Sequence, residues 1–373
     1  MEKSLSNQKS KIAQILFWIA FISLILIRSL NSAGVDIPYR TRLLQLMAIL
    51  FGVKILLTQY SVKEWIAIGI TAVITGLAFL SAKDTLWIEI AVMLIAAKDM
   101  DLKKCCSVYF GIAAVSMVAM MVLSGIGVID NFKLVQDFDR GGVETRYAFG
   151  YTHPNVFFSN VMNVVALGIL AFYDKIKPWH MVVLTGVNVV LLLLAASRTG
   201  FIVVQVLLIA IFIVKKWQKV IECKWFCIIG YVSIIFASLI SYSIFVVNRR
   251  ALIGLNRIFT GRIWLTLDHA PLTEWSVLPI DRETFVIDMG FVHVMFYWGI
   301  LLGLIYIGLI LWNFRRLYLK KDAAAVVVLL AYTLFTMIES HGFSMFFVGN
   351  LMFILMIGWG KERNDVSTEK SNS

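Results

Sequence analysis

The stretch IAQILFWIAFISLILI, residues 12–27, decides the fold class of this chain, because it contains no charged side chain and similar apolar runs recur up to residue 360. Over all 373 residues, 60% are apolar and 15% are charged, whereas soluble domains carry roughly 25% charged residues. A soluble domain of this composition would lack a solvated surface, because its apolar side chains exceed what one core holds. The sequence therefore predicts an all-α integral membrane protein.

The apolar runs predict about twelve transmembrane helices, because a helix needs about 20 mostly apolar residues to cross a bilayer. Lysines precede the first run, as in a signal peptide, but no small-residue cleavage site follows, and we interpret the run as an uncleaved span. The spans form one membrane domain, residues 1–361, followed by a disordered cytoplasmic tail, residues 362–373. The predicted spans are residues 12–27, 42–58, 64–82, 85–98, 104–128, 154–173, 180–196, 199–214, 225–247, 287–313, 322–339 and 343–360.

The distribution of Lys and Arg predicts the orientation in the membrane. With both termini on the cytoplasmic side, 20 of the 34 basic residues lie inside, in the sense of the positive-inside rule. Two long loops, about residues 129–153 and 248–286, then lie outside, and apolar residues between 255 and 265 predict a short interfacial helix in the second loop. The basic residues cluster at the ends of apolar runs, so the net charge of +11 does not indicate a nucleic-acid partner.

The predicted outer side differs from the inner side in the type of its basic residues. Of the 20 inside, 17 are lysine, whereas 11 of the 13 outside are arginine. Arginine presents a planar fork of N–H donors that binds a phosphate or carboxylate through two bonds, whereas lysine is a mobile point charge. Contact with lipid headgroups explains Arg28, Arg40 and Arg42. The remaining arginines indicate an anion-binding site.

Several ionisable residues lie at the predicted outer ends of spans, where they are costly and are therefore candidates for function. Arg198 is the sharpest case, because apolar runs flank it on both sides; the alternative is a structural ion pair with Glu339 or Asp288. A histidine there can serve as a general base or pack as a hydrogen-bonded structural side chain. The candidates are Arg146, His153, Arg198, Arg257, Arg262, Asp288, His293, Glu339 and His341.

Five sequence features between residues 146 and 350 share the predicted outer face. They are RYAFGYTHPN (146–155), SRTG (197–200), TGRIW (260–264), IDMGF (287–291) followed by Gly299, and the pair Glu339 and Asn350. In this order they resemble motifs of bacterial polysaccharide repeat-unit polymerases of the Wzy type, which are distant relatives of the O-antigen ligases. Met289 departs from this pattern, because the family usually has Asn at that position.

The resemblance implies a metal-independent glycosyltransferase of the bacterial cytoplasmic membrane, with its active site on the extracytoplasmic face. Such polymerases transfer a growing glycan from its polyprenyl pyrophosphate carrier to a sugar hydroxyl of the incoming lipid-linked repeat, for a capsule, an exopolysaccharide or an O-antigen. No cofactor is implied, and the chain has no HExxH zinc motif or glycine-rich phosphate loop. The implied partners are the polyprenyl-pyrophosphate-linked oligosaccharide, membrane lipid, a chain-length regulator and a flippase.

The same resemblance suggests roles for the candidates. Arg146, Arg198 and Arg262, with Arg257 in reserve, would stabilise the negative charge that grows on the leaving pyrophosphate. A general base must take the proton of the attacking hydroxyl. The candidates for this base are Asp288 and His153, followed by His293, Glu339 and His341.

Two alternatives to a polymerase stay open. A ligase-like glycan transferase shares the donor chemistry and differs only in its acceptor. A flippase or transporter would move the same lipid-linked oligosaccharide, but transporters typically have repeat symmetry and charges near the middle of the membrane. Here the charges gather at the predicted outer edge, and both long loops lie on one side, which favours an interfacial enzyme.

Overall fold

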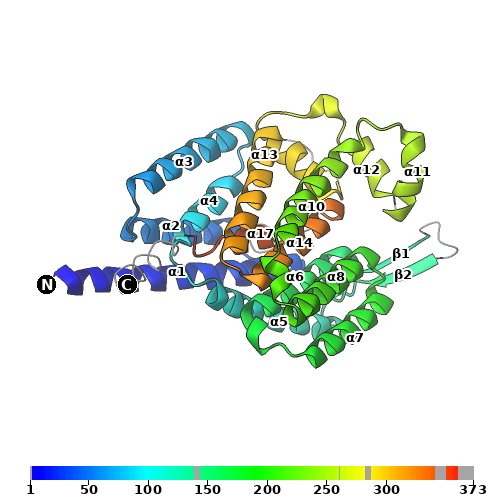
Figure 1. Cartoon of the computed structure of the whole chain (residues 1–373), viewed down its shortest axis with the longest axis horizontal. Coiled ribbons are helices and arrows are strands. Elements are labelled where there is room, and N and C mark those ends of the chain that lie inside the picture. The colour runs from blue at the N-terminus through cyan, green and yellow to red at the C-terminus, as the bar shows by residue number, and fades with distance from the viewer. Residues whose placement is uncertain (1, 138–142, 260, 282–286, 341–349, 360–373) are drawn as a thin grey trace.

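The computed structural model consists mainly of helices joined by connections of varied length (Figure 1). It describes residues 2–137, 143–259, 261–281, 287–340 and 350–359. Within these residues the elements are α1 (Glu2–Ser32), α2 (Arg40–Leu57), α3 (Val62–Ala82), α4 (Leu86–Ala96), α5 (Leu102–Gly125), β1 (Lys133–Asp137), β2 (Val143–Tyr147), α6 (Pro154–Phe172), η1 (Tyr173–Lys175), α7 (Pro178–Ala195), α8 (Arg198–Lys216), α9 (Lys219–Glu222), α10 (Lys224–Ser243), α11 (Arg249–Ile258), α12 (Arg262–His269), η2 (Leu272–Glu274), α13 (Gly290–Leu319), α14 (Ala323–Ile338) and α17 (Leu351–Ile354).

Eight helices in the described part of the chain are long and apolar enough to cross a membrane, namely α1, α3, α5, α6, α7, α8, α10 and α13. Outer helices expose large apolar side chains, such as Ile70 of α3, Val115 of α5 and Leu193 of α7, each more than half exposed. Such faces suit contact with lipid, and helices satisfy their backbone hydrogen bonds internally. The expectation of a helical membrane protein is confirmed, whereas the count of about twelve spans and the orientation stay predictions.

The core lies around α6, α13 and α14. Helix α6 packs against α5 and α8, and α14 packs against α8, α10 and α13. Large side chains that are at most 1% exposed fill this centre, including Phe158, Phe291, Phe314 and Tyr332. The N-terminal helices pack on one another, α1 on α2 and both α2 and α3 on α4, and α1 also packs against α5. In Figure 1 these helices form the blue to cyan group.

The first long loop contains a short antiparallel β-hairpin, an addition to the helical fold that the sequence does not predict. Strands β1 and β2 pair with Lys133 opposite Tyr147, and the Val, Thr and Tyr residues of β2 favour a strand. Successive side chains of a strand point to opposite faces, so Glu144 and Arg146 share one face. Arg146 is buried, while Thr145 between them is exposed. The hairpin therefore turns one acidic and one basic side chain toward the helices.

The second long loop contains two α-helices, α11 and α12, whereas the sequence predicts one short interfacial helix. Helix α11 ends at Ile258, and α12 begins after Gly261, whose φ of 86° costs glycine little. The Asn256 side chain accepts a hydrogen bond from the Trp264 backbone N–H at 3.1 Å, which ties the two helices together. Arg262 thereby occupies the first position of α12, where it is buried.

The predicted last span, residues 343–360, is not a continuous helix over its described part, which corrects that expectation. Residues 341–349 and the predicted tail, 362–373, lie outside the described residues. Helix α17 covers only four residues, and turns follow it. All residues from 351 to 357 are nevertheless buried. The apolar composition here reflects burial in protein, which sequence alone does not distinguish from burial in lipid.

Two polar side chains of α13 make this non-helical segment possible. The Asn313 Nδ2 donates to the Met352 carbonyl at 3.2 Å, and the Arg316 guanidinium donates to the carbonyls of Leu355 and Met356. Both side chains are buried. Buried non-helical backbone requires such partners, because its carbonyls lack the hydrogen bonds that a helix would supply.

Gly299 interrupts α13 at the point where the end of the second long loop contacts the helix. Its φ of 81° and ψ of 157° lie in a region that essentially only glycine occupies. The backbone N–H of Ile300 donates to the Ser276 carbonyl at 2.9 Å, so the loop hydrogen-bonds into the kink. A Cβ atom on Gly299 would lie 2.6 Å from the Leu278 carbonyl carbon. Glycine is therefore required here by both backbone angle and space.

We expect Gly299→Ala to lower the free energy of unfolding by about 2 kcal/mol, because alanine is strained at this backbone conformation. Gly308 is the matched control, since it lies in the same helix and a Cβ there would meet nothing within 4 Å. Gly308→Ala should be neutral or slightly stabilising, because alanine favours the helix. Thermal unfolding of the purified proteins in detergent measures both effects, and equal melting temperatures for the two variants would contradict the argument.

Candidate functional site

Glu144 of the hairpin joins two of the candidate arginines. Its Oε2 lies 3.0 Å from Arg146 Nη2, and its Oε1 lies 3.0 Å from Arg198 Nη2. The Arg146 side chain is 9% exposed and the Arg198 side chain is 58% exposed. The partner of Arg198 is thus Glu144, and not Glu339 or Asp288 as the sequence alternative suggested. One carboxylate holds two guanidinium groups side by side.

The turn between α7 and α8 places Arg198 at this position. Helix α7 ends where Ala196 takes a φ of 49°, and α8 begins two residues later at Arg198. The Ser197 hydroxyl donates to Asn155 Oδ1 at 3.3 Å, which fixes the turn to the start of α6. The Asn188 side chain donates to the Phe201 carbonyl at 3.1 Å across the same turn. The SRTG segment is therefore a rigid corner between two helices.

Arg262 is the centre of a second, more deeply buried group. Its Nη1 donates to the Thr199 hydroxyl at 3.0 Å, its Nε lies 3.3 Å from Asp288 Oδ2, and its Nη2 donates to the Glu339 carboxylate. The side chains of Arg262, Asp288 and Glu339 are 9%, 14% and 2% exposed. Glu339 directly follows α14, and Asp288 precedes α13. The guanidinium therefore connects α12 to the start of α8, to the end of α14 and to the segment before α13.

The two groups are continuous, because Arg198 and Thr199 are neighbours in the chain. Arg198 pairs with Glu144, and Thr199 accepts from Arg262. We call the set Arg146, Arg198, Arg262, Glu144, Asp288 and Glu339 the arginine–carboxylate cluster. The structure thus brings together three arginines and two acidic residues that the sequence singles out in five separate segments.

Two candidate histidines lie at the starts of helices α6 and α13. His153 is the N-cap of α6, and its Nδ1 accepts a hydrogen bond from the Asn155 backbone N–H at 3.1 Å. A neutral ring with an accepting Nδ1 carries its proton on Nε2, so this arrangement favours a positioning role over a role as base. His293 lies in the first turn of α13, with its ring centroid 4.7 Å from that of Tyr297.

The structure does not connect the two remaining candidates to the cluster. Arg257 is exposed on the last turn of α11, and no hydrogen bond or ion pair joins it to the cluster within the residues that the structure describes. His341 lies outside the described residues.

Sequence reasoning missed Glu144, although it binds two of the proposed arginines. The signal was present as the spacing Glu144-x-Arg146 in VETRY, because residues two apart on a strand share a face. The strand itself was not predicted, so the spacing carried no meaning. The search for an anion-binding site also directed attention to basic residues, and an acidic residue such as Glu144 does not bind an anion.

An anion that binds the cluster competes with carboxylates that already contact the arginines. Three guanidinium groups face three carboxylates, so their charges cancel in this state. The planar donor fork of arginine binds carboxylate and phosphate with the same geometry. A phosphate group can therefore occupy the position of a carboxylate beside these arginines. Glu144 is the most replaceable partner, because its side chain is 23% exposed while that of Glu339 is 2% exposed.

We expect Glu339→Gln to lower the free energy of unfolding by about 3 kcal/mol, because removing one partner of a buried ion pair leaves a charge without compensation. Asp268→Asn is the matched control, since Asp268 pairs with Arg249 at 2.5 Å and both side chains are more than half exposed. The control should change stability by less than about 1 kcal/mol. Detergent-solubilised melting curves compare the two, and equal losses would show that burial of the pair is unimportant.

Comparisons with models of protein families, with curated proteins and with solved structures find no match for this chain. The chemistry that the cluster can perform is therefore argued from its own geometry. That geometry consists of guanidinium donors at the junction of five segments, which are partly shielded from water and contact side-chain carboxylates.

Proposed function

We propose that this protein is a polymerase of lipid-linked oligosaccharide repeat units. It transfers the growing glycan from polyprenyl pyrophosphate to a sugar hydroxyl of the incoming lipid-linked repeat, on the outer face of the bacterial cytoplasmic membrane. The observation that carries the proposal is the convergence of Arg146, Arg198 and Arg262, which come from segments far apart in the chain. The motif resemblance to Wzy-type polymerases supports the same reaction.

In the proposed reaction the arginines bind the pyrophosphate of the donor. The bond between the sugar C1 and the pyrophosphate oxygen breaks, and the leaving group gains negative charge that the guanidinium groups stabilise. Because Thr199 and Glu339 hold Arg262 in place, its donors need no reorganisation during the reaction. Partial exclusion of water strengthens this stabilisation.

The acceptor hydroxyl attacks C1 and forms the new glycosidic bond while a carboxylate accepts its proton. Asp288 is the proposed base, because it belongs to the cluster and its side chain is more accessible than that of Glu339. Glu339, which is nearly inaccessible, is assigned the positioning of Arg262. The products are a glycan longer by one repeat and polyprenyl pyrophosphate.

The first test uses purified protein in detergent with lipid-linked repeat units and no nucleotide sugar. We expect the wild type to lengthen the glycan and Arg198→Lys to produce mainly single repeats, because lysine keeps the charge but loses the two-bond fork. Arg262→Lys should act in the same way, and its melting temperature reports whether the protein remains folded.

Arg249→Lys is the matched control, since Arg249 is exposed and pairs with Asp268 outside the cluster. Its product lengths on a glycan gel should match the wild type. Wild-type glycan lengths in Arg198→Lys would contradict the assignment of Arg198 to pyrophosphate binding. A wild type that moves the lipid across vesicles without lengthening the glycan would indicate a flippase, and transfer only to a different acceptor would indicate a ligase.

The variants Glu144→Gln and Asp288→Asn test two different roles. Glu144 is the carboxylate that the donor phosphate displaces, and Asp288 is the proposed general base. Glu144→Gln should lower the KM for the lipid-linked donor severalfold with kcat within about twofold, because the competing negative charge is gone. Asp288→Asn should lower kcat by about 100-fold or more, the usual loss for a general base. Steady-state kinetics with the purified protein measure both values. The assignments are reversed if Glu144→Gln, and not Asp288→Asn, abolishes kcat.

A further inference from the structure

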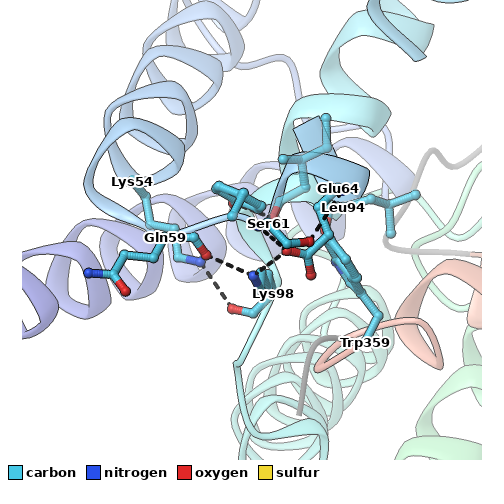
Figure 2. A network of polar contacts seen from close by, with 9 residues as sticks. Lys54, Gln59, Ser61, Glu64, Leu94, Lys98 and Trp359 are labelled. Atoms are coloured by element: carbon cyan, nitrogen blue, oxygen red, sulfur yellow. Dashed lines mark hydrogen bonds and ion pairs between the residues drawn. The ribbon is translucent and has the colours of Figure 1, made fainter. Parts of the chain in front are cut away.

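A second polar network lies far from the arginine–carboxylate cluster, at the other end of α1. The C-terminal end of α1 leads to Gly34, where a Cβ atom would lie 3.2 Å from Thr152 in the segment that precedes α6. Near its N-terminal end, Lys9 lines a cavity together with Lys54 of α2 and Lys98, which follows α4. Figure 2 shows Lys54 and Lys98 approaching each other beside Gln59. None of the proposed polymerase chemistry uses these lysines.

The positive charge of Lys98 in this network is balanced by an acidic partner. Its Nζ donates to the Gln59 carbonyl at 2.7 Å and to Glu64 Oε2 at 3.0 Å, and it lies 4.6 Å from the centroid of the Tyr60 ring. Glu64 also accepts from the Ser61 backbone N–H at 2.6 Å as part of a capping box at the start of α3. Lys98 therefore has a structural role, because its charge holds the start of α3 against the end of α4.

Lys54 has a different environment. It is 3% exposed, and its Nζ donates to the Lys98 backbone carbonyl at 3.0 Å. An ammonium group carries three protons, and that carbonyl is its one hydrogen-bond acceptor within the described residues. No carboxylate lies within ion-pair distance of it in that part of the chain, and Asp99 attracts it only from further away. A buried cation normally has a closer anionic partner.

The space beside Lys54 is large enough for such a partner. The cavity has a volume of about 720 Å³ and is lined by Lys9, Lys54, Lys98 and Asp99, with hydroxyl groups from Ser10 and Thr58. Because Glu64 neutralises Lys98, the charges of Lys9 and Lys54 exceed that of Asp99 by one unit. The cavity is therefore suited to a ligand with one net negative charge.

Aromatic side chains around the network indicate that it lies at the membrane surface. The ring centroids of Tyr60 and Trp65 are 5.3 Å apart, and Trp359 donates its indole N–H to the Leu94 carbonyl at 2.9 Å. Tyr and Trp are enriched where the headgroups meet the hydrocarbon. A phosphate at this depth belongs to a lipid more readily than to a soluble molecule.

We propose that this cavity binds the phosphate-bearing headgroup of an anionic phospholipid, with the ammonium groups of Lys54 and Lys9 donating to the phosphate oxygens. The net charge of the lining favours an anionic over a zwitterionic headgroup. The Asp99 carboxylate can accept a hydrogen bond from a headgroup hydroxyl, as phosphatidylglycerol carries. The bound lipid joins α1 and α2 to the connection between α4 and α5, and its binding does not depend on the proposed polymerase reaction.

The test measures lipid binding to the full-length purified protein by native mass spectrometry, with phosphatidylglycerol, phosphatidylcholine and inorganic phosphate as separate ligands. We expect Lys54→Met and Lys9→Met each to weaken phosphatidylglycerol binding about tenfold, the effect of losing one charge-assisted hydrogen bond. Lys11→Met is the matched control, because Lys11 is exposed on the same helix two residues from Lys9 but does not line the cavity. Its binding should stay within about twofold of the wild type.

A second measurement keeps the test decisive if Lys54→Met changes folding. Phosphatidylglycerol should raise the melting temperatures of the wild type and of Lys11→Met. The increase should be smaller for Lys54→Met and for Lys9→Met, in which the replaced lysine is exposed. Equal lipid binding by Lys9→Met and Lys11→Met overturns the proposal, as does equal binding of phosphatidylcholine and phosphatidylglycerol by the wild type. Lysine-dependent binding of inorganic phosphate as tight as that of the lipid would also overturn it, since the ligand would then be soluble.

Discussion

The guanidinium of Arg262 holds together segments that the chain leaves far apart. It contacts Thr199 at the start of α8, Asp288 before α13 and Glu339 after α14, while it belongs itself to α12. In a helical bundle surrounded by lipid, packing between apolar faces does not by itself fix which helix ends meet, because the lipid is as apolar as the helices. A buried charge with several specific partners supplies that selectivity. The candidate site is thus also the point that sets the arrangement of the helices around it.

The same requirement explains other irregular parts of the structure. Lys98 meets Glu64 and a carbonyl at the opposite end of α1, and Arg316 caps the carbonyls of a buried segment that is not helical. In each case a cation enters an apolar bundle only where fixed acceptors receive it. Lys54 departs from this rule, because its ammonium meets a single carbonyl among the residues that the structure describes. That departure is the reason to assign it an external anion.

The sequence predicts most of the helices, because runs such as residues 154–173 and 199–214 are apolar over nearly their whole length and match α6 and α8 closely. It does not predict the hairpin, since β2 has only five residues and its strand signal is weak. The candidate arginines could be found from their residue type and position, but their partners could not. Asp288 and Glu339 were equally plausible partners for Arg198 until the fold brought Arg262 between them. Composition also could not separate α17 from a lipid-facing span.

The hairpin that carries Glu144 has a consequence for the order of events at the site. A two-stranded ribbon has little stability of its own, so its position depends on the packing of β2 against α7 and on the ion pair between Glu144 and Arg198. A donor phosphate that takes the place of Glu144 at Arg198 would remove the second of these contacts and loosen the ribbon. Loading of the donor would then open the way for the second substrate, and an obligatory sequence, donor before acceptor, would arise without any separate gate.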